Sequence, residues 1–159
     1  MFKKLCCFNI CVNNRMNIPL DWDKITDGVP EFSLKDTTKQ AKVVSVYDGD
    51  TVKIVFPLQE KLYKWNCRLA GVDTPELRTR NKLEKAHGYL VRDKLREKIL
   101  NKVVTVKCFE FDKYGRLLIS IYCDDDNVSV NKWLIDNDYA FKYDGGTKKD
   151  WGEYLALKK

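Results

Sequence analysis

Two short acidic segments have residue types and spacing that could hold a divalent cation. The first is Asp48-Gly49-Asp50-Thr51, and the second is Asp73-Thr74-Pro75-Glu76. Hard cations such as Ca²⁺ take oxygen ligands, mainly carboxylates and carbonyls. Each segment alone also has an ordinary interpretation, because Asp-Gly is a common turn and proline often occupies the first position of a helix. The chemistry therefore depends on whether the fold brings the two segments together.

Two arginines and one further acid could act on a phosphodiester bond. Arg68 lies five residues before Asp73, and Arg116 follows the turn-like segment Asp112-Lys113-Tyr114-Gly115. A guanidinium forms paired hydrogen bonds with phosphate and stabilises the charge that develops during hydrolysis. Glu76 could orient or deprotonate the attacking water. Strict strand alternation puts Arg68 and Asp73 on opposite faces, so we expect a bulge or a strand end between them.

Apolar residues at every second position predict five strands. In the first two, Val44 and Val46 share even numbering with Val52, Ile54 and Phe56, and Asp48-Gly49 forms the turn between them. Asp48 and Asp50 fall on the same numbering, which places both acids on the inward face, where a cation would offset their burial. The other strands are indicated by Trp65-Cys67-Leu69, Val104-Val106-Cys108 and Leu117-Ile119-Ile121.

Helical spacing predicts one long helix and two short ones. Residues 83–100 carry Leu83, His87, Val91, Leu95 and Ile99 at intervals of four, and we assign His87 no catalytic role. Gly88 should weaken this helix by about 1 kcal/mol relative to alanine. A short helix follows Ser129, and Asp150 with Glu153 resembles a capping box before the last helix.

The order of these elements predicts an α+β, mainly β fold: a five-stranded OB-fold barrel with about three helices. We expect residues 41–159 to form this domain. Residues 1–40 contain two prolines and no clear periodicity, so we interpret them as a partly disordered N-terminal arm.

The charge distribution favours a polyanionic partner. The chain has a net charge of +6, and residues 61–107 alone hold 13 Lys and Arg against five Asp and Glu, a local net charge of +8. Clustered positive charge attracts nucleic acid. The alternative is a solvated helix face, since many of these charges fall on the predicted helix.

Cysteine usage and hydropathy exclude some classes. Six scattered cysteines and a single histidine do not form a zinc motif, and they suit a reducing compartment. No apolar run approaches the roughly 18 residues of a membrane span. We favour an intracellular location, although Lys3-Lys4 before a short apolar stretch could suit secretion and Cys6-Cys7 could suit lipid anchoring.

Three separated motifs together resemble the staphylococcal-nuclease-like (thermonuclease) family. They are Asp48-Gly49-Asp50-Thr51-Val52, the run from Arg68 to Glu76, and Asp112-Lys113-Tyr114-Gly115-Arg116, and the resemblance covers residues 41 to 140. The paired Tyr-x-Tyr of the family is absent, and Tyr139 and Tyr143 are spaced differently.

The resemblance implies a calcium-dependent nuclease that cleaves the P–O5′ bond of DNA and/or RNA and leaves 3′-phosphates. It implies Ca²⁺ held by Asp50, Asp73 and the Thr74 carbonyl, with Asp48 supporting the ligands. Arg68 and Arg116 would bind the phosphate, Glu76 would act on the water, and Lys113 and Tyr114 would lie beside the nucleotide. We expect a monomer that prefers single strands.

Two other functions remain open at this point. Domains of this fold also serve as noncatalytic nucleic-acid-binding modules. Such a module has no need to keep Asp50, Asp73 and Glu76 together with Arg68 and Arg116, because acids repel the ligand. A protein-interaction domain that docks through the arm would leave the acids unexplained, so the enzyme is the favoured hypothesis.

Overall fold

The computed structural model describes residues 21–124 and 126–158, and the chain divides into two units, residues 1–32 and 33–159. The described part of the first unit contains the 3-10 helix η1, Trp22–Lys24. Lys3-Lys4 and Cys6-Cys7, on which the expectations about location depend, lie outside the described residues. None of the described helices combines the length and apolarity needed to cross a bilayer.

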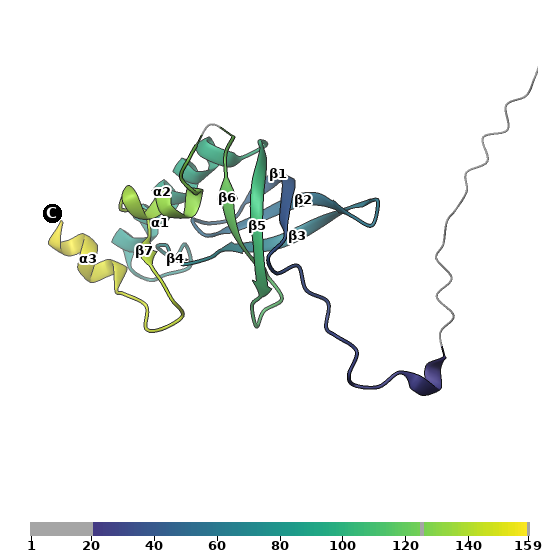
Figure 1. Ribbon diagram of the computed structural model, residues 1–159. Helices are drawn as coiled ribbons and strands as arrows, with labels where there is room; N and C mark the ends of the chain where they lie inside the picture. The colour runs from purple at the N-terminus through teal and green to yellow at the C-terminus, as the bar shows by residue number, and fades with distance from the viewer. Residues whose placement is uncertain (1–20, 125, 159) are drawn as a thin grey trace, which may run out of the picture. The chain divides into compact units, whose positions relative to one another are not determined.

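The second unit is built on a closed five-stranded barrel (Figure 1). Around the barrel the strand order is β1-β2-β3-β6-β5, and only the β3–β6 pair is parallel. This arrangement confirms the predicted α+β, mainly β barrel. The strands are β1 (Thr38–Val46), β2 (Thr51–Leu58), β3 (Lys61–Leu69), β5 (Val103–Phe111) and β6 (Leu117–Tyr122).

Alternating apolar residues fill the barrel, as the sequence pattern predicted for four of its strands. Phe56, Cys67, Val106 and Ile119 represent β2, β3, β5 and β6, and each is fully buried. Burying a Val, Leu, Ile or Phe side chain contributes about 1.5–3 kcal/mol. The alternation therefore sets which face of each strand turns inward.

Strand β1 departs from the predicted alternation. Its pairing with β2 shifts register between Val43 and Ser45, so one extra residue is inserted. Val43 and Val46 are buried while Val44 is 37% exposed, so the placement of Val44 on the inward face was wrong. β1 also begins at Thr38 and Leu34 joins the core, so residues before position 41 belong to the barrel.

Three helices accompany the barrel (Figure 1). Helix α1 (Lys82–Ile99) begins at Asn81, whose side chain accepts hydrogen bonds from two backbone N–H groups, and it ends close to the predicted position. Helix α2 (Val130–Asp136) is capped by Ser129, and α3 (Trp151–Leu157) by Asp150. All three helices match the sequence prediction.

Two two-residue strands, β4 (Val72–Asp73) and β7 (Phe141–Lys142), pair with each other outside the barrel. They are too short to produce a periodic pattern, so the sequence did not predict them. Through this pair the segment containing Asp73 is joined to the segment that leads to α3. The pairing therefore brings the C-terminal part of the chain to the acidic segment.

Candidate active site

A cleft of about 820 Å³ opens at one end of the barrel. Its walls come from the β1–β2 turn, the β3–β4 turn, the β5–β6 hairpin and the segment after β7. Eight residues singled out in the sequence line it: Asp48, Asp50, Arg68, Thr74, Glu76, Lys113, Tyr114 and Arg116. The ninth, Asp73, is 2% exposed and contacts the lining residue Lys148. The fold thus brings the predicted residues together, while their roles stay predictions.

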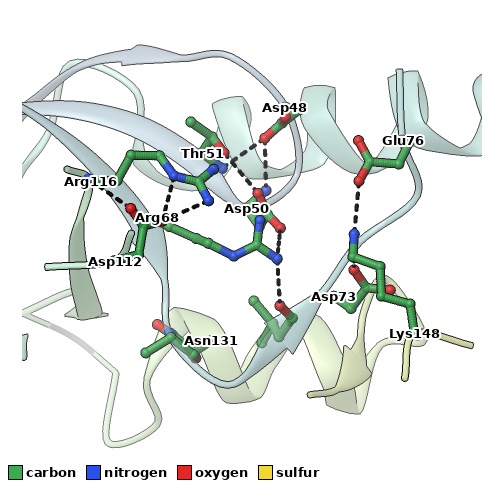
Figure 2. A network of polar contacts seen from close by, with 12 residues as sticks. Asp48, Asp50, Thr51, Arg68, Asp73, Glu76, Asp112, Arg116, Asn131 and Lys148 are labelled. Carbon is green, nitrogen blue, oxygen red and sulfur yellow. Dashed lines mark hydrogen bonds and ion pairs between the residues drawn. The ribbon is translucent and has the colours of Figure 1, made fainter. Parts of the chain in front are cut away.

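Asp50 is a buried carboxylate held from several sides (Figure 2). Its Oδ2 lies 2.7 Å from Arg68 Nη2, and its Oδ1 accepts a hydrogen bond of 2.8 Å from Thr51 Oγ1. Burial raises the pKa of Asp50 to about 7, and the negative charges of Asp48 and Glu76 also raise it. The positive charge of Arg68 lowers the pKa but does not outweigh these effects. A carboxyl group in this environment gains strongly from an additional cation.

Asp48 shapes the turn that carries Asp50. Its Oδ1 accepts hydrogen bonds from the backbone N–H groups of Asp50, at 3.2 Å, and Thr51, at 2.8 Å. These bonds close an Asx-type turn, which explains why an aspartate stands at this position. The supporting role expected for Asp48 stays a prediction.

Two glycines allow the acidic segments to approach α1. A Cβ atom on Gly49 would lie 2.8 Å from side-chain atoms of both Thr74 and Val91. A Cβ atom on Gly88 would lie 2.9 Å from the Pro75 carbonyl oxygen. The β1–β2 turn and the Thr74-Pro75 segment can therefore contact each other and α1 only because these side chains are absent. This close packing explains why glycine stands at position 88, although glycine lowers the stability of the helix.

Strand β3 ends between Arg68 and Asp73, so the strict alternation that would put these two residues on opposite faces does not apply. The strand ends at Leu69, and the chain turns at Gly71, which has φ of +75°, before β4 begins. The predicted strand end is thus confirmed. Arg68 lies opposite Thr51 in the β2–β3 pair, which directs its side chain to Asp50, and its Nη2 also lies 3.4 Å from the Val72 carbonyl.

Lys148 bridges the second acidic segment. Its Nζ lies 2.7 Å from Asp73 Oδ1 and 2.9 Å from Glu76 Oε1, as Figure 2 shows. Burial disfavours its charge, but the hydrogen bonds and charges of Asp73 and Glu76 outweigh that effect and raise the pKa of Lys148. Lys148 therefore occupies the place beside Asp73 and Glu76 as a cation. No motif in the sequence marks Lys148 as a site residue.

Arg116 is bound within its own hairpin. Its Nε and Nη2 both lie 2.7 Å from Asp112 Oδ2, and Asp112 Oδ1 accepts hydrogen bonds from the backbone of Tyr114 and Arg116. The Arg116 guanidinium also lies 5.5 Å from the centroid of the Tyr114 ring. Asp112 thus fixes both the hairpin and the direction of the Arg116 side chain, which faces the cleft (Figure 2).

Asn131 is a positioning residue that the sequence analysis missed. Its side-chain amide donates to the carbonyls of Ala70, at 2.8 Å, and Ile119, at 3.0 Å, and its oxygen accepts from the Ile121 N–H. These buried bonds tie the β3–β4 turn to β6 and α2. The residue signals no chemistry in the sequence, since a single asparagine within a short helix usually faces solvent.

Aromatic packing holds the last helix against α1. Trp151 is 3% exposed, and its ring stacks on Phe141 with centroids 4.0 Å apart. On the other side it meets the His87 ring at 5.6 Å, so His87 belongs to this packing. The contact places the segment before α3, including Tyr143 and Lys148, along the cleft.

The donor chemistry of the cleft fits a hard divalent cation. Asp50 and Asp73 supply buried carboxylates, Thr74 of the second segment packs close to Gly49 of the first, and all their donor atoms are oxygen. Within the described ranges no three His, Cys, Asp or Glu side chains are arranged to hold a metal ion. Instead Arg68 and Lys148 neutralise the two aspartates. A bound cation would take over this neutralisation.

Comparison with known proteins places these residues in a family. Residues 66–159 match the family model described as Staphylococcal nuclease homologue. The matched region contains Arg68, Asp73, Glu76 and Arg116, whereas the β1–β2 turn with Asp50 precedes it.

Curated relatives show moderate identity. A protein of Escherichia coli O157:H7 named as an uncharacterized endonuclease is 29% identical over 103 residues, covering 65% of this chain and 60% of the relative. An uncharacterized protein of Methanocaldococcus jannaschii is 33% identical over 124 residues, covering 64% of this chain and 58% of the relative. A probable endonuclease of Uncinocarpus reesii is 27% identical, covering 74% and 42%. The chain thus spans about 60% or less of the length of these relatives.

Proposed function

Because the chain belongs to the family of staphylococcal nuclease homologues, we propose that it is a calcium-dependent nuclease acting on DNA and/or RNA. The observation that carries this proposal is the convergence of the separately predicted acids and arginines in one cleft. The names of two relatives, an uncharacterized endonuclease and a probable endonuclease, support the same activity.

In this proposal Asp50, Asp73 and the Thr74 carbonyl would hold Ca²⁺, and Asp48 would keep the first acidic turn in place. The bound cation would neutralise the phosphate and the charge that grows on it. The oxygen donors of Asp50, Asp73 and Thr74 support this assignment, because Ca²⁺ takes carboxylate and carbonyl oxygens as ligands.

Glu76 is the residue proposed to act on water. Its side chain is 54% exposed and reaches the cleft, so a water molecule can approach it. The water oxygen attacks phosphorus while Glu76 orients the water and accepts one of its protons. The P–O5′ bond breaks, which leaves a 3′-phosphate on one fragment, and the departing O5′ takes a proton from solvent to become the 5′-hydroxyl of the other. Lys148 donates to Glu76 Oε1 at 2.9 Å, so the second carboxylate oxygen, Oε2, is the one proposed to accept the proton.

Arg68 and Arg116 are proposed to bind the phosphate oxygens. Both line the cleft, and each forms an ion pair with an aspartate, Arg68 with Asp50 and Arg116 with Asp112. Lys113 and Tyr114 stand at the tip of the β5–β6 hairpin beside Arg116, where a nucleotide would contact them. Tyr114 is 72% exposed, so its ring is free to pack against a base.

The test compares two glutamate-to-glutamine variants on single-stranded DNA. Glu76→Gln should reduce turnover by orders of magnitude while binding stays near the wild-type level. The control, Glu60→Gln, makes the same chemical change at the exposed β2–β3 hairpin tip and should cleave normally. Products should carry 3′-phosphates, detected by end-group analysis. Equal activity in Glu76→Gln would remove Glu76 from its role, and binding without any cleavage would favour a noncatalytic binding module.

A further inference from the structure

A second groove, of about 480 Å³, lies beside the cleft residues and has a different chemical character. The end of β1, the segment after Glu76 and one face of α1 form it. Four of its lining residues are cationic and two are tyrosines: Arg78, Lys85, Arg92, Arg96, Tyr47 and Tyr89. No acid lines it. The groove therefore concentrates positive charge and aromatic surface in one place.

The cations of the groove are only partly neutralised. Asp93 pairs with Arg92 at 2.8 Å and with Arg96 at 3.5 Å. Arg96 is further fixed by its hydrogen bonds to the Val46 carbonyl. For Arg78 and Lys85, by contrast, the described part of the chain offers no carboxylate at ion-pair distance. Two cations thus remain available for an external anion.

The tyrosine rings are exposed and lie beside guanidinium groups. Tyr47 is 47% exposed and Tyr89 is 41% exposed. Arg78 lies 5.8 Å from the centroid of the Tyr47 ring, and Arg92 lies 4.7 Å from that of Tyr89. Interleaved arginines and exposed aromatic rings are the features with which proteins bind phosphates and stacked bases of single strands. If these charges only formed a solvated helix face, the two exposed tyrosine rings beside them would have no explanation.

Chain continuity connects this groove with the catalytic cleft. Tyr47 directly precedes Asp48, and its N–H bonds to the Thr51 carbonyl at 2.9 Å. Arg78 follows Glu76 by two residues. Both acidic segments therefore continue along the chain into residues that line the groove.

We propose that this groove is an extended binding site for single-stranded nucleic acid, in which Arg78 and Lys85 contact backbone phosphates and Tyr89 stacks on a base. The inference rests on the proposed function and specifies its substrate as a strand that reaches beyond the bond being cleaved. It also gives a function to the basic residues of α1 that line the groove, Lys85, Arg92 and Arg96.

The proposal is tested by measuring how (dT)16 and (dT)3 bind to variants that all carry Glu76→Gln. Binding is followed by fluorescence anisotropy in calcium buffer, and a gel checks that the oligonucleotides stay intact. Arg78→Gln/Lys85→Gln should weaken (dT)16 binding about tenfold and reduce the salt slope by about 1.4, because single strands lose about 0.7 per phosphate contact. Binding of (dT)3, which the cleft can hold, should stay unchanged. The control, Lys61→Gln/Lys64→Gln, removes the same charge from exposed positions of β3.

A second pair of variants isolates stacking from charge. Tyr89→Ala should weaken (dT)16 binding about tenfold, and Tyr89→Phe should restore it. The proposed site would be overturned if Arg78→Gln/Lys85→Gln and Lys61→Gln/Lys64→Gln lost equal affinity for (dT)16. It would also be overturned if polyglutamate competed for binding as well as unlabelled (dT)16 does. If the protein with Glu76 intact binds the oligonucleotide but never cleaves it, the nuclease proposal fails, while the binding of the groove variants still decides the groove. If it cleaves and the groove variants bind normally, only the groove fails.

Discussion

Replacing Lys148 by methionine should tighten calcium binding about tenfold while weakening the calcium-free fold. Lys148 Nζ lies 2.7 Å from Asp73 and 2.9 Å from Glu76, so a cation at Asp73 must displace it. Lys148 is 44% exposed, and solvent limits each ion pair to at most about 1 kcal/mol, or somewhat more at the buried Asp73. Together the pairs contribute about 1–2 kcal/mol, and 1.4 kcal/mol corresponds to tenfold in affinity.

The same change acts in the opposite direction without calcium. Methionine leaves Asp73, which is 2% exposed, without its cation, so the calcium-free melting temperature should fall by about 3–6 °C. Calcium should then raise the melting temperature more in Lys148→Met than in the wild type, because a ligand stabilises the state to which it binds. Isothermal titration calorimetry gives the dissociation constant, and thermal melts with chelator and with calcium give the stabilities.

The neighbouring Lys149 provides a matched control. Its Nζ lies 5.0 Å from the Phe141 ring, and within the described residues no carboxylate pairs with it. Lys149→Met should therefore leave calcium affinity unchanged. If Lys148→Met melts lower but binds calcium like the wild type, Lys148 does not compete with the cation, and the assignment of Asp73 as a calcium ligand is contradicted.

Three further changes test how the site is held. Arg68→Lys should lower kcat by at least tenfold, because ammonium cannot form the paired bonds of guanidinium, and wild-type rates would remove the proposed clamp. Gly88→Ala should destabilise the fold by about 1–3 kcal/mol, because the alanine Cβ would lie 2.9 Å from the Pro75 carbonyl oxygen. This loss should outweigh the gain that alanine gives within a helix. A variant that is more stable than the wild type in urea unfolding would refute this packing. Asn131→Ala should cost about 2–3 kcal/mol by leaving buried partners unbonded, seen as a lower urea midpoint with unchanged slope; an unchanged midpoint would show that these bonds are dispensable.

The barrel could be predicted from the sequence because its core strands carry the alternation that burial of one face demands. Val52, Ile54 and Phe56 follow the rule and are fully buried. The rule failed at Val44, because the inserted residue in β1 reverses the inward face and a bulge has no periodic signature. Strands β4 and β7 were likewise invisible, since two residues cannot alternate.

The residues of the candidate site also include some that the sequence predicted and some that it did not. Asp50 and Arg116 stood out because charged residues flank turns between strands, and the cleft gathers them. Lys148 and Asn131 did not, because each acts across a long sequence separation, on Glu76 72 residues away and on Ala70 61 residues away. Such contacts depend on how α2 and the segment before α3 pack, and a single sequence does not encode that packing as a local pattern.

The release of acid-soluble nucleotides from single-stranded DNA tests the central claim most directly. The reaction is followed first with calcium, then after a chelator is added, and finally after calcium is restored. The proposed site predicts rapid release that the chelator stops and renewed calcium restarts, with Glu76→Gln inactive throughout. Tight DNA binding without release in calcium, magnesium or manganese would contradict the nuclease assignment, as would release that is indifferent to the chelator.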